Sequence, residues 1–169
     1  LYCDNSQAYN YGSLGMCDYP DNILNAFEEK VSLEGDTYTL NEDFTITDDT
    51  YFPLKISDGK TFDGSNNTIT YDGTSEWGGL FEAADDSSFT VQNVTFDLYG
   101  SNLDGGAGCI TSNNFKSWSY VNENCSWTIH NCHSKSTNST NSKQIATSGG
   151  GLCGQGIGNG SANVIITNC

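Results

Sequence analysis

The sequence contains no arginine, only two prolines and one methionine among its 169 residues, and 16% of its residues are charged. That charged fraction is well below the average of about 25% for globular proteins. A helical bundle needs Leu, Ala, Glu and Lys along its helical faces, so this composition disfavours one. The sequence also lacks any run of about 20 apolar residues, the length that a membrane-spanning helix requires. We therefore expect no membrane span.

Positive charge is scarce in this chain. Its six cationic residues are all lysines and face 21 acidic residues, which gives a formal net charge of −15. Such a surface repels phosphate backbones, so the sequence predicts no nucleic-acid partner. The acidic residues could bind Ca²⁺ loosely, although a solvated surface without a dedicated ligand is the simpler interpretation. We expect no other cofactor.

Small polar residues are abundant instead. Gly, Ser, Thr and Asn together supply 74 of the 169 residues, and only 36% of the chain is hydrophobic. The 20 aromatic residues and the short β-branched runs argue against disorder. The length suits one domain or a fragment of a repeat array. The composition therefore favours an all-β, turn-rich architecture.

Three features indicate a secreted or cell-surface protein. The chain begins at Leu1 rather than Met, so a leader has been removed or the chain is a fragment. The sequence has seven cysteines, none of them in a CxxC pair, and such a content is typical of oxidising compartments. Five Asn-x-Ser/Thr sequons predict N-linked glycans, at Asn66, Asn93, Asn124, Asn138 and Asn159.

The first 34 residues are expected to form an N-terminal cap. Cys3 and Cys17 are close enough in sequence to staple a compact loop. A short capping helix should follow, because Asp21 is a plausible N-cap and the apolar residues of segment 23–31 fall on one helical face.

From residue 35 onward the hydrophobic pattern alternates with a period of two, which predicts short strands separated by Asp- and Gly-containing turns; four of these strands are segments 37–40, 44–47, 54–56 and 68–71. Two alignments recur three times along the second half of the chain. One places Phe81, Cys109 and Cys153 in one register, and the other places Val94, Cys132 and Cys169 in a second register. One such repeat cannot bury its apolar side chains alone, whereas stacked repeats can. The sequence therefore predicts stacked β-coils over residues 35–169.

Stacking would bring equivalent residues of neighbouring coils about 4.8 Å apart. That separation allows disulfides between Cys109 and Cys153 and between Cys132 and Cys169; reduced thiols stacked in a buried ladder are the alternative. Cys125 has no counterpart and is the candidate unpaired thiol. Asn residues also align, and they could form an internal amide ladder: Asn93, Asn131 and Asn168. For Asn93, an inward amide and a glycan exclude each other.

Several segments resemble the right-handed parallel β-helix, or pectate-lyase-like, superfamily. Segment 35–40 (Gly-Asp-Thr-Tyr-Thr-Leu) after the predicted helix is similar to the family's first strand, and segment 61–69 is similar to its G-x-(N/H)-x-I turn of the coil. Gly79-Leu80-Phe81 is similar to its common GLF turn. The resemblance implies a right-handed parallel β-helix, a solenoid, with a short N-terminal capping helix. It is weak for function, because this scaffold carries lyases, hydrolases, adhesins and fibres alike.

No catalytic or metal-binding residues are predicted. The lysines are scattered, and His130 and His133 occur in His-Asn-Cys-His, where they point to opposite faces of a strand. Asp48-Asp49 and Asp85-Asp86 could act as acid–base pairs, but adjacent residues diverge and solvated turns explain them better. Five aromatic residues could stack on sugars or simply pack in the core: Trp77, Tyr99, Trp118, Tyr120 and Trp127.

The chain ends at Cys169 in mid-coil, so the β-helix is expected to be incomplete there and to expose an unpaired edge. A continuation of the chain, another copy or a capping chain would cover this edge. These observations predict a non-catalytic extracellular structural or adhesive protein, a glycosylated subunit of a surface fibre or filament that could also contact cell-surface carbohydrate. A β-helix carbohydrate-active enzyme, a polysaccharide lyase or hydrolase, is the alternative, as is a carbohydrate- or ice-binding module.

Overall fold

The structure is a computed structural model, and it describes residues 22–49, 52–83, 88–99, 103, 106–112, 126–137, 151–154 and 163–169. These residues contain one short helix and twelve short strands. The elements are α1 (Asn22–Ala26), β1 (Val31–Glu34), β2 (Thr37–Leu40), β3 (Phe44–Ile46), β4 (Leu54–Ile56), β5 (Lys60–Asp63), β6 (Thr68–Tyr71), β7 (Phe81–Ala83), β8 (Phe89–Gln92), β9 (Thr95–Asp97), β10 (Ser126–His130), β11 (His133–Lys135) and β12 (Asn163–Thr167).

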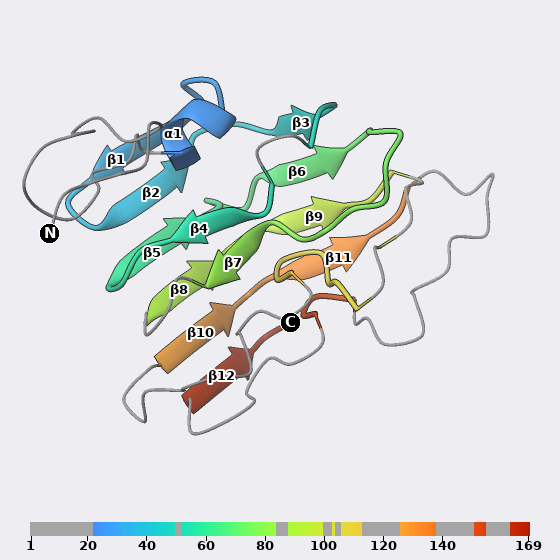
Figure 1. Cartoon of the computed structure of the whole chain (residues 1–169). Coiled ribbons are helices and arrows are strands. Elements are labelled where there is room, and N and C mark those ends of the chain that lie inside the picture. The colour runs from blue at the N-terminus through green and yellow to red at the C-terminus, as the bar shows by residue number, and fades with distance from the viewer. Residues whose placement is uncertain are drawn as a thin grey trace, which may run out of the picture.

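The strands form three sheets. The largest has six strands in the order β1-β2-β5-β8-β10-β12, the second has four in the order β11-β9-β6-β3, and the third pairs β4 with β7. All pairs are parallel except β1 with β2. Figure 1 shows the parallel strands stacked in chain order, from the blue N-terminal end to the red C-terminal end.

The predicted right-handed parallel β-helix is wrong for this structure. The sheets differ in size, the six-stranded sheet is mixed, and no closed solenoid is found among the described residues. The two-residue turn at Gly35-Asp36 reverses the chain and makes β1 antiparallel to β2. Among the described residues, the third sheet ends with β7, because segment 106–112 continues it only through one isolated bridge, between Phe81 and Thr111.

Of the two predicted alignments, one agrees with the strand pairing and the other does not. Strands β8, β10 and β12 pair in the expected register, with Gln92 opposite His130 and His130 opposite Thr167. The other alignment is shifted by two residues, because Phe81 pairs with Thr111 instead of Cys109. The glycine-rich segments flanking Cys109 carry too few side chains to fix a strand register.

The capping helix is much shorter than expected. It ends at Ala26, and Glu28 and Glu29 adopt left-handed backbone angles, with φ of 49° and 68°. Val31, expected on the helical face, instead begins β1 opposite Leu40. The predicted Cys3–Cys17 loop lies outside the described residues. The boundary at residue 34 stays a prediction.

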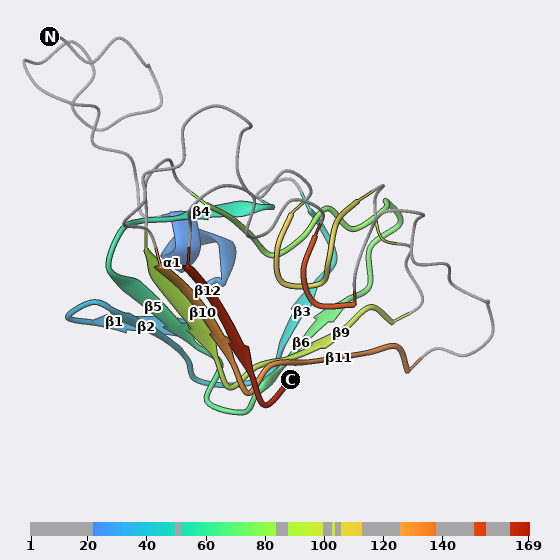
Figure 2. The same ribbon diagram turned by 90° about the horizontal axis from the view of Figure 1, so that it is seen from below.

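The core lies between the sheets. In Figure 2 the six-stranded and four-stranded sheets form two sides of a V, and β4 lies across its open side. Aromatic rings fill the space: Phe62 contacts Phe27 and Phe81, with ring centroids 5.4 and 5.0 Å apart. Trp77 stacks on Phe96 at 5.0 Å and is fully buried. The alternation of strand residues therefore places one side chain in two inside this core.

Candidate functional site

The two outermost strands of the six-stranded sheet, β1 and β12, each carry an exposed apolar side chain on the inner face of the sheet. The strand registers align one inner column of six side chains, Leu33, Tyr38, Phe62, Val91, Ile129 and Ile166. Its four middle members are buried. The terminal members are not: Leu33 is 40% exposed and Ile166 is 46% exposed. Both ends of the column therefore present aliphatic surface to solvent.

The outer edge of β12 also presents backbone groups. The N–H of Asn131 donates to the carbonyl of Thr167 over 2.9 Å, so that carbonyl faces β10. Carbonyls alternate in direction along a strand, so those of Val164 and Ile166 face away from the sheet. Such an edge is a template for pairing with another strand. We call β12 with the exposed Ile166 side chain the open edge.

The outer face of the same sheet carries a column of threonines. The register places Thr37, Thr61, Thr90 and Thr128 side by side, each on a neighbouring strand. The adjacent outward column is mixed in chemistry and contains Thr39, Asp63, Gln92, His130 and Thr167. The regular two-dimensional threonine array that would favour ice binding is therefore missing from the described part of this face.

Asparagines occupy the corners after four strands of this sheet, β5, β8, β10 and β12. Asn66, Asn93, Asn131 and Asn168 all adopt left-handed φ values between 50° and 64°. Asparagine tolerates this conformation better than most residues. The amide of Asn131 donates to Oδ1 of Asn93 over 3.0 Å. The predicted amide ladder is confirmed for this pair.

Asp63 anchors the corner. Its carboxylate accepts hydrogen bonds from the Ser65 backbone N–H, the Gln92 side chain and the Asn93 side chain, at 2.8, 2.7 and 3.1 Å. Burial alone would raise the pKa of Asp63, but these hydrogen bonds outweigh burial and hold the pKa below its usual value.

The two described sequon asparagines differ in their surroundings. The Asn93 amide nitrogen is engaged by Asp63, whereas Asn66 is exposed. Asn124, Asn138 and Asn159 lie outside the described residues. All five glycosylation sites stay predictions.

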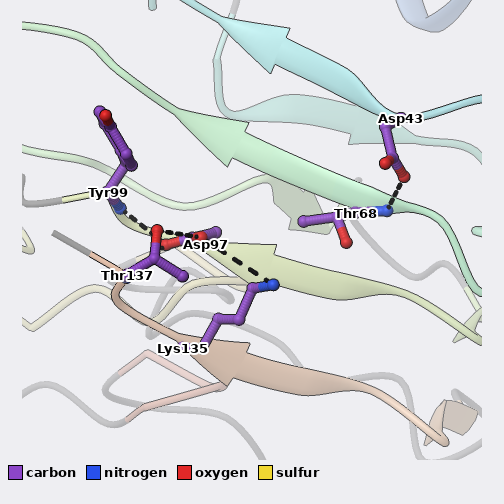
Figure 3. A network of polar contacts seen from close by, with 6 residues as sticks. All are labelled: Asp43, Thr68, Asp97, Tyr99, Lys135 and Thr137. Atoms are coloured by element: carbon purple, nitrogen blue, oxygen red, sulfur yellow. Dashed lines mark hydrogen bonds and ion pairs between the residues drawn. The ribbon is translucent and has the colours of Figure 1, made fainter.

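A second polar cluster surrounds Asp97, which is 4% exposed (Figure 3). Its carboxylate accepts hydrogen bonds from the Thr137 hydroxyl at 2.7 Å, the Thr137 N–H at 3.0 Å and the Tyr99 N–H at 3.0 Å. Lys135 Nζ lies 4.0 Å away. Burial alone would raise the pKa of Asp97, yet these hydrogen bonds and the lysine hold it below its usual value. The cluster ties β9 to the segment after β11.

Replacing Asp97 by asparagine should make stability less dependent on pH. A lowered folded pKa stabilises the fold above the unfolded carboxyl value of about 4, and this contribution is lost as the pH falls through the folded pKa. We expect Asp97→Asn to lower the free energy of unfolding by roughly 1.5–3 kcal/mol at about pH 7 and by less at about pH 3. Urea denaturation at both pH values measures this.

Thr137→Val is the matched variant, because it removes only the hydroxyl donor and should lose less at about pH 7. An equal loss for Asp97→Asn at both pH values would contradict the assignment of a stabilising charge to Asp97.

The four described cysteines, Cys109, Cys132, Cys153 and Cys169, are free thiols in the structure. Burial raises the pKa of Cys109 and Cys132 to about 12 and that of Cys153 to about 11. Cys169 and Cys153 both act electrostatically on Cys132, whereas Cys109 is influenced by Asp97. Both disulfides stay predictions. Cys3, Cys17 and Cys125 lie outside the described residues.

The aromatic residues considered for sugar stacking, and the two histidines, differ in how far they are exposed to solvent. Trp77 and Trp127 are core residues and cannot stack on a sugar, whereas Tyr99 is 42% exposed. His130 Nδ1 lies 2.7 Å from the Thr167 hydroxyl, and His133 is exposed on β11. Trp118 and Tyr120 lie outside the described residues.

Charged side chains meet in pairs. Lys30 contacts Glu42 at 3.0 Å, and Lys60 contacts Asp36 at 2.8 Å. Among the described residues, no three His, Cys, Asp or Glu side chains gather to hold a metal ion. Asp49 accepts from the Tyr71 hydroxyl at 3.2 Å, and Asp85-Asp86 fall outside the described part of the chain. Loose Ca²⁺ binding stays a prediction.

No protein family matches this chain, and neither a curated protein nor a solved structure shows significant similarity to it. The resemblance to the pectate-lyase-like superfamily therefore depends on the quoted motifs alone. No helix among the described residues is long and apolar enough to cross a membrane.

Proposed function

We propose that this chain is a non-catalytic structural or adhesive protein that acts outside the cell as a glycosylated subunit of a surface fibre or filament. The open edge is the observation that carries this proposal. The buried column ends in a 46% exposed Ile166 on a strand that has one partner strand among the described residues, so the sheet is incomplete there. Pairing with another chain would bury the side chain and satisfy the backbone at once.

The sequence features support an extracellular setting for such a subunit. The sequons and the cysteine content favour secretion. Stacked short strands with matched registers suit a load-bearing element, because each strand is hydrogen-bonded to its neighbours along the stack.

Ile166→Thr tests the proposal against a matched control. Ile165 has almost the same exposure, 42%, but it lies on the outer face of the same strand. Loss of buried aliphatic surface should weaken self-association of the Ile166→Thr variant by about tenfold, whereas Ile165→Thr should change it little. Sedimentation velocity over a concentration series measures both.

Electron microscopy of the concentrated wild-type protein completes the test. Linear assemblies support the fibre role. A wild-type chain that stays monomeric at every concentration overturns it.

A further inference from the structure

We propose that the partner at the open edge is strand β1 of a second copy of this chain, so that copies join head to tail. This inference rests on the proposed function and specifies the surface that the second copy contributes. Leu33 on β1 and Ile166 on β12 are opposite ends of one inner column. Joining them would continue that column from one copy into the next.

The strand directions are compatible with this junction. Strands β2, β5, β8, β10 and β12 run parallel, and β1 runs against β2. In two copies stacked in the same orientation, β12 of one copy would therefore meet β1 of the next in an antiparallel pair.

On β1, the backbone groups that point away from β2 include those of Leu33, the residue that would face Ile166. Asn41 N–H donates to the Lys30 carbonyl over 2.9 Å, which makes Lys30 and Asn41 a hydrogen-bonded pair. Hydrogen-bonded and non-hydrogen-bonded pairs alternate in antiparallel ladders. The pair of Leu33 and Tyr38 is then non-hydrogen-bonded, so the N–H and carbonyl of Leu33 point away from β2.

Ile166 and Leu33 therefore match in two respects. Both direct their backbone groups outward from the sheet, and both place their side chains on its inner face. Directly opposed residues in a hydrogen-bonded antiparallel pair satisfy both conditions. Among the described residues, β1 and β12 each have one partner strand, and Leu33 and Ile166 are two of the four exposed large hydrophobic residues.

The charge distribution favours unlike ends. All 21 acidic residues lie within residues 1–123, together with four lysines, whereas residues 124–169 contain two lysines and no acidic residue. The formal charges of the two parts are therefore −17 and +2. Negative charge is thus confined to the first part of the sequence.

The structure places these charges at opposite ends of the sheets. Glu34 lies on β1, and Asp43 precedes β3, the outermost strand of the four-stranded sheet at that end, where Glu42 is paired with Lys30. Lys135 lies on β11, the outermost strand at the other end, and its side chain is 47% exposed although Asp97 lies 4.0 Å away. Like ends would repel or remain neutral, and unlike ends would attract. Charge complementarity therefore favours a head-to-tail contact over a symmetric one.

A head-to-tail contact of this kind is heterologous, and it produces an open filament unless the rotation between copies closes a ring. Each junction would bury one Leu33 and one Ile166. Both free edges of the six-stranded sheet would then be paired everywhere except at the filament ends.

Complementary edge variants of the full-length chain test the junction. Leu33→Lys blocks the β1 side, and Ile166→Lys blocks the β12 side. Each variant alone should be monomeric, but an equimolar mixture should give one-to-one dimers that stop growing, because one intact edge of each kind remains. Ser32→Lys and Ile165→Lys add the same charge on the outer face and should still assemble. Light scattering after size-exclusion chromatography measures these species.

The outcomes separate the possible contacts. Dimers formed by Leu33→Lys alone would show a symmetric β12 contact and overturn the head-to-tail inference while leaving the fibre role intact. A mixture that stays monomeric, or single variants that assemble as the wild type does, would also overturn it. A monomeric wild type would instead refute the proposed function. Thermal melting checks that each variant folds, and Leu33→Ser replaces Leu33→Lys if the latter does not.

Discussion

Phe62→Ala should destabilise the fold by about 3–5 kcal/mol, the usual cost of removing a buried phenylalanine ring. Phe62 is the second of the four buried members of the inner column and is completely inaccessible to solvent. Its ring contacts Phe27 from the helical segment and Phe81 from the third sheet. Removing it would open a cavity where all three parts of the core meet. Chemical denaturation measures the loss.

Thr61→Ala is the matched control for this variant. Thr61 is the preceding residue of β5 and lies in the outward threonine column. Its replacement should change the free energy of unfolding by about 0.5 kcal/mol or less. Since small domains are stable by only about 5–15 kcal/mol, Phe62→Ala could abolish most of the folded state. Equal effects of the two substitutions would contradict the assignment of Phe62 to the core.

Gly64→Ala should cost about 3 kcal/mol or more, which is large for one added methyl group. A Cβ atom at this position would lie 2.5 Å from the Asn93 carbonyl oxygen and 2.5 Å from Cβ of Val94. The Asn93 oxygen belongs to the backbone of the corner after β8, the strand paired with β5, and it already accepts a hydrogen bond from Asn66 N–H. Neither neighbour can withdraw without separating the corner of β5 from that of β8.

Gly78→Ala provides the comparison. A Cβ atom there would meet nothing within 4 Å, so this substitution should be neutral or slightly stabilising through the unfolded chain. Thermal melting of both variants distinguishes close packing at Gly64 from a general cost of replacing glycine. A neutral Gly64→Ala variant would show that the corners are not in contact.

The alternating pattern predicted several strands well. Segments 37–40, 54–56 and 68–71 were expected as strands and are β2, β4 and β6 with the same bounds. The side-chain period of two decides these segments, because every second residue must enter the core. The predicted helix failed beyond Ala26 because pairing of Val31 with Leu40 outweighed the local helical pattern. A pattern within one segment cannot reveal that competition.

The site was only partly predictable. The asparagine corners are visible in sequence, because each follows an alternating run. The open edge was expected from the end of the chain, but Leu33 at the other end of the column was missed, since β1 was not predicted as a strand. The confinement of acidic residues to positions 1–123 is a sequence signal that could have indicated unlike ends. Which end of the sheets carries the acidic residues could be decided only once the strand order was known.

The asparagine corners join successive strands of the six-stranded sheet, as the hydrogen bond from Asn131 to Asn93 shows. Successive corners are separated by 27, 38 and 37 residues, from Asn66 to Asn93, Asn131 and Asn168, yet the strands between them keep one register. Chain inserted between two corners can therefore lengthen without disturbing the alignment of the strands. The connecting segments can therefore differ in length and surface chemistry while β5, β8, β10 and β12 keep the same pairing.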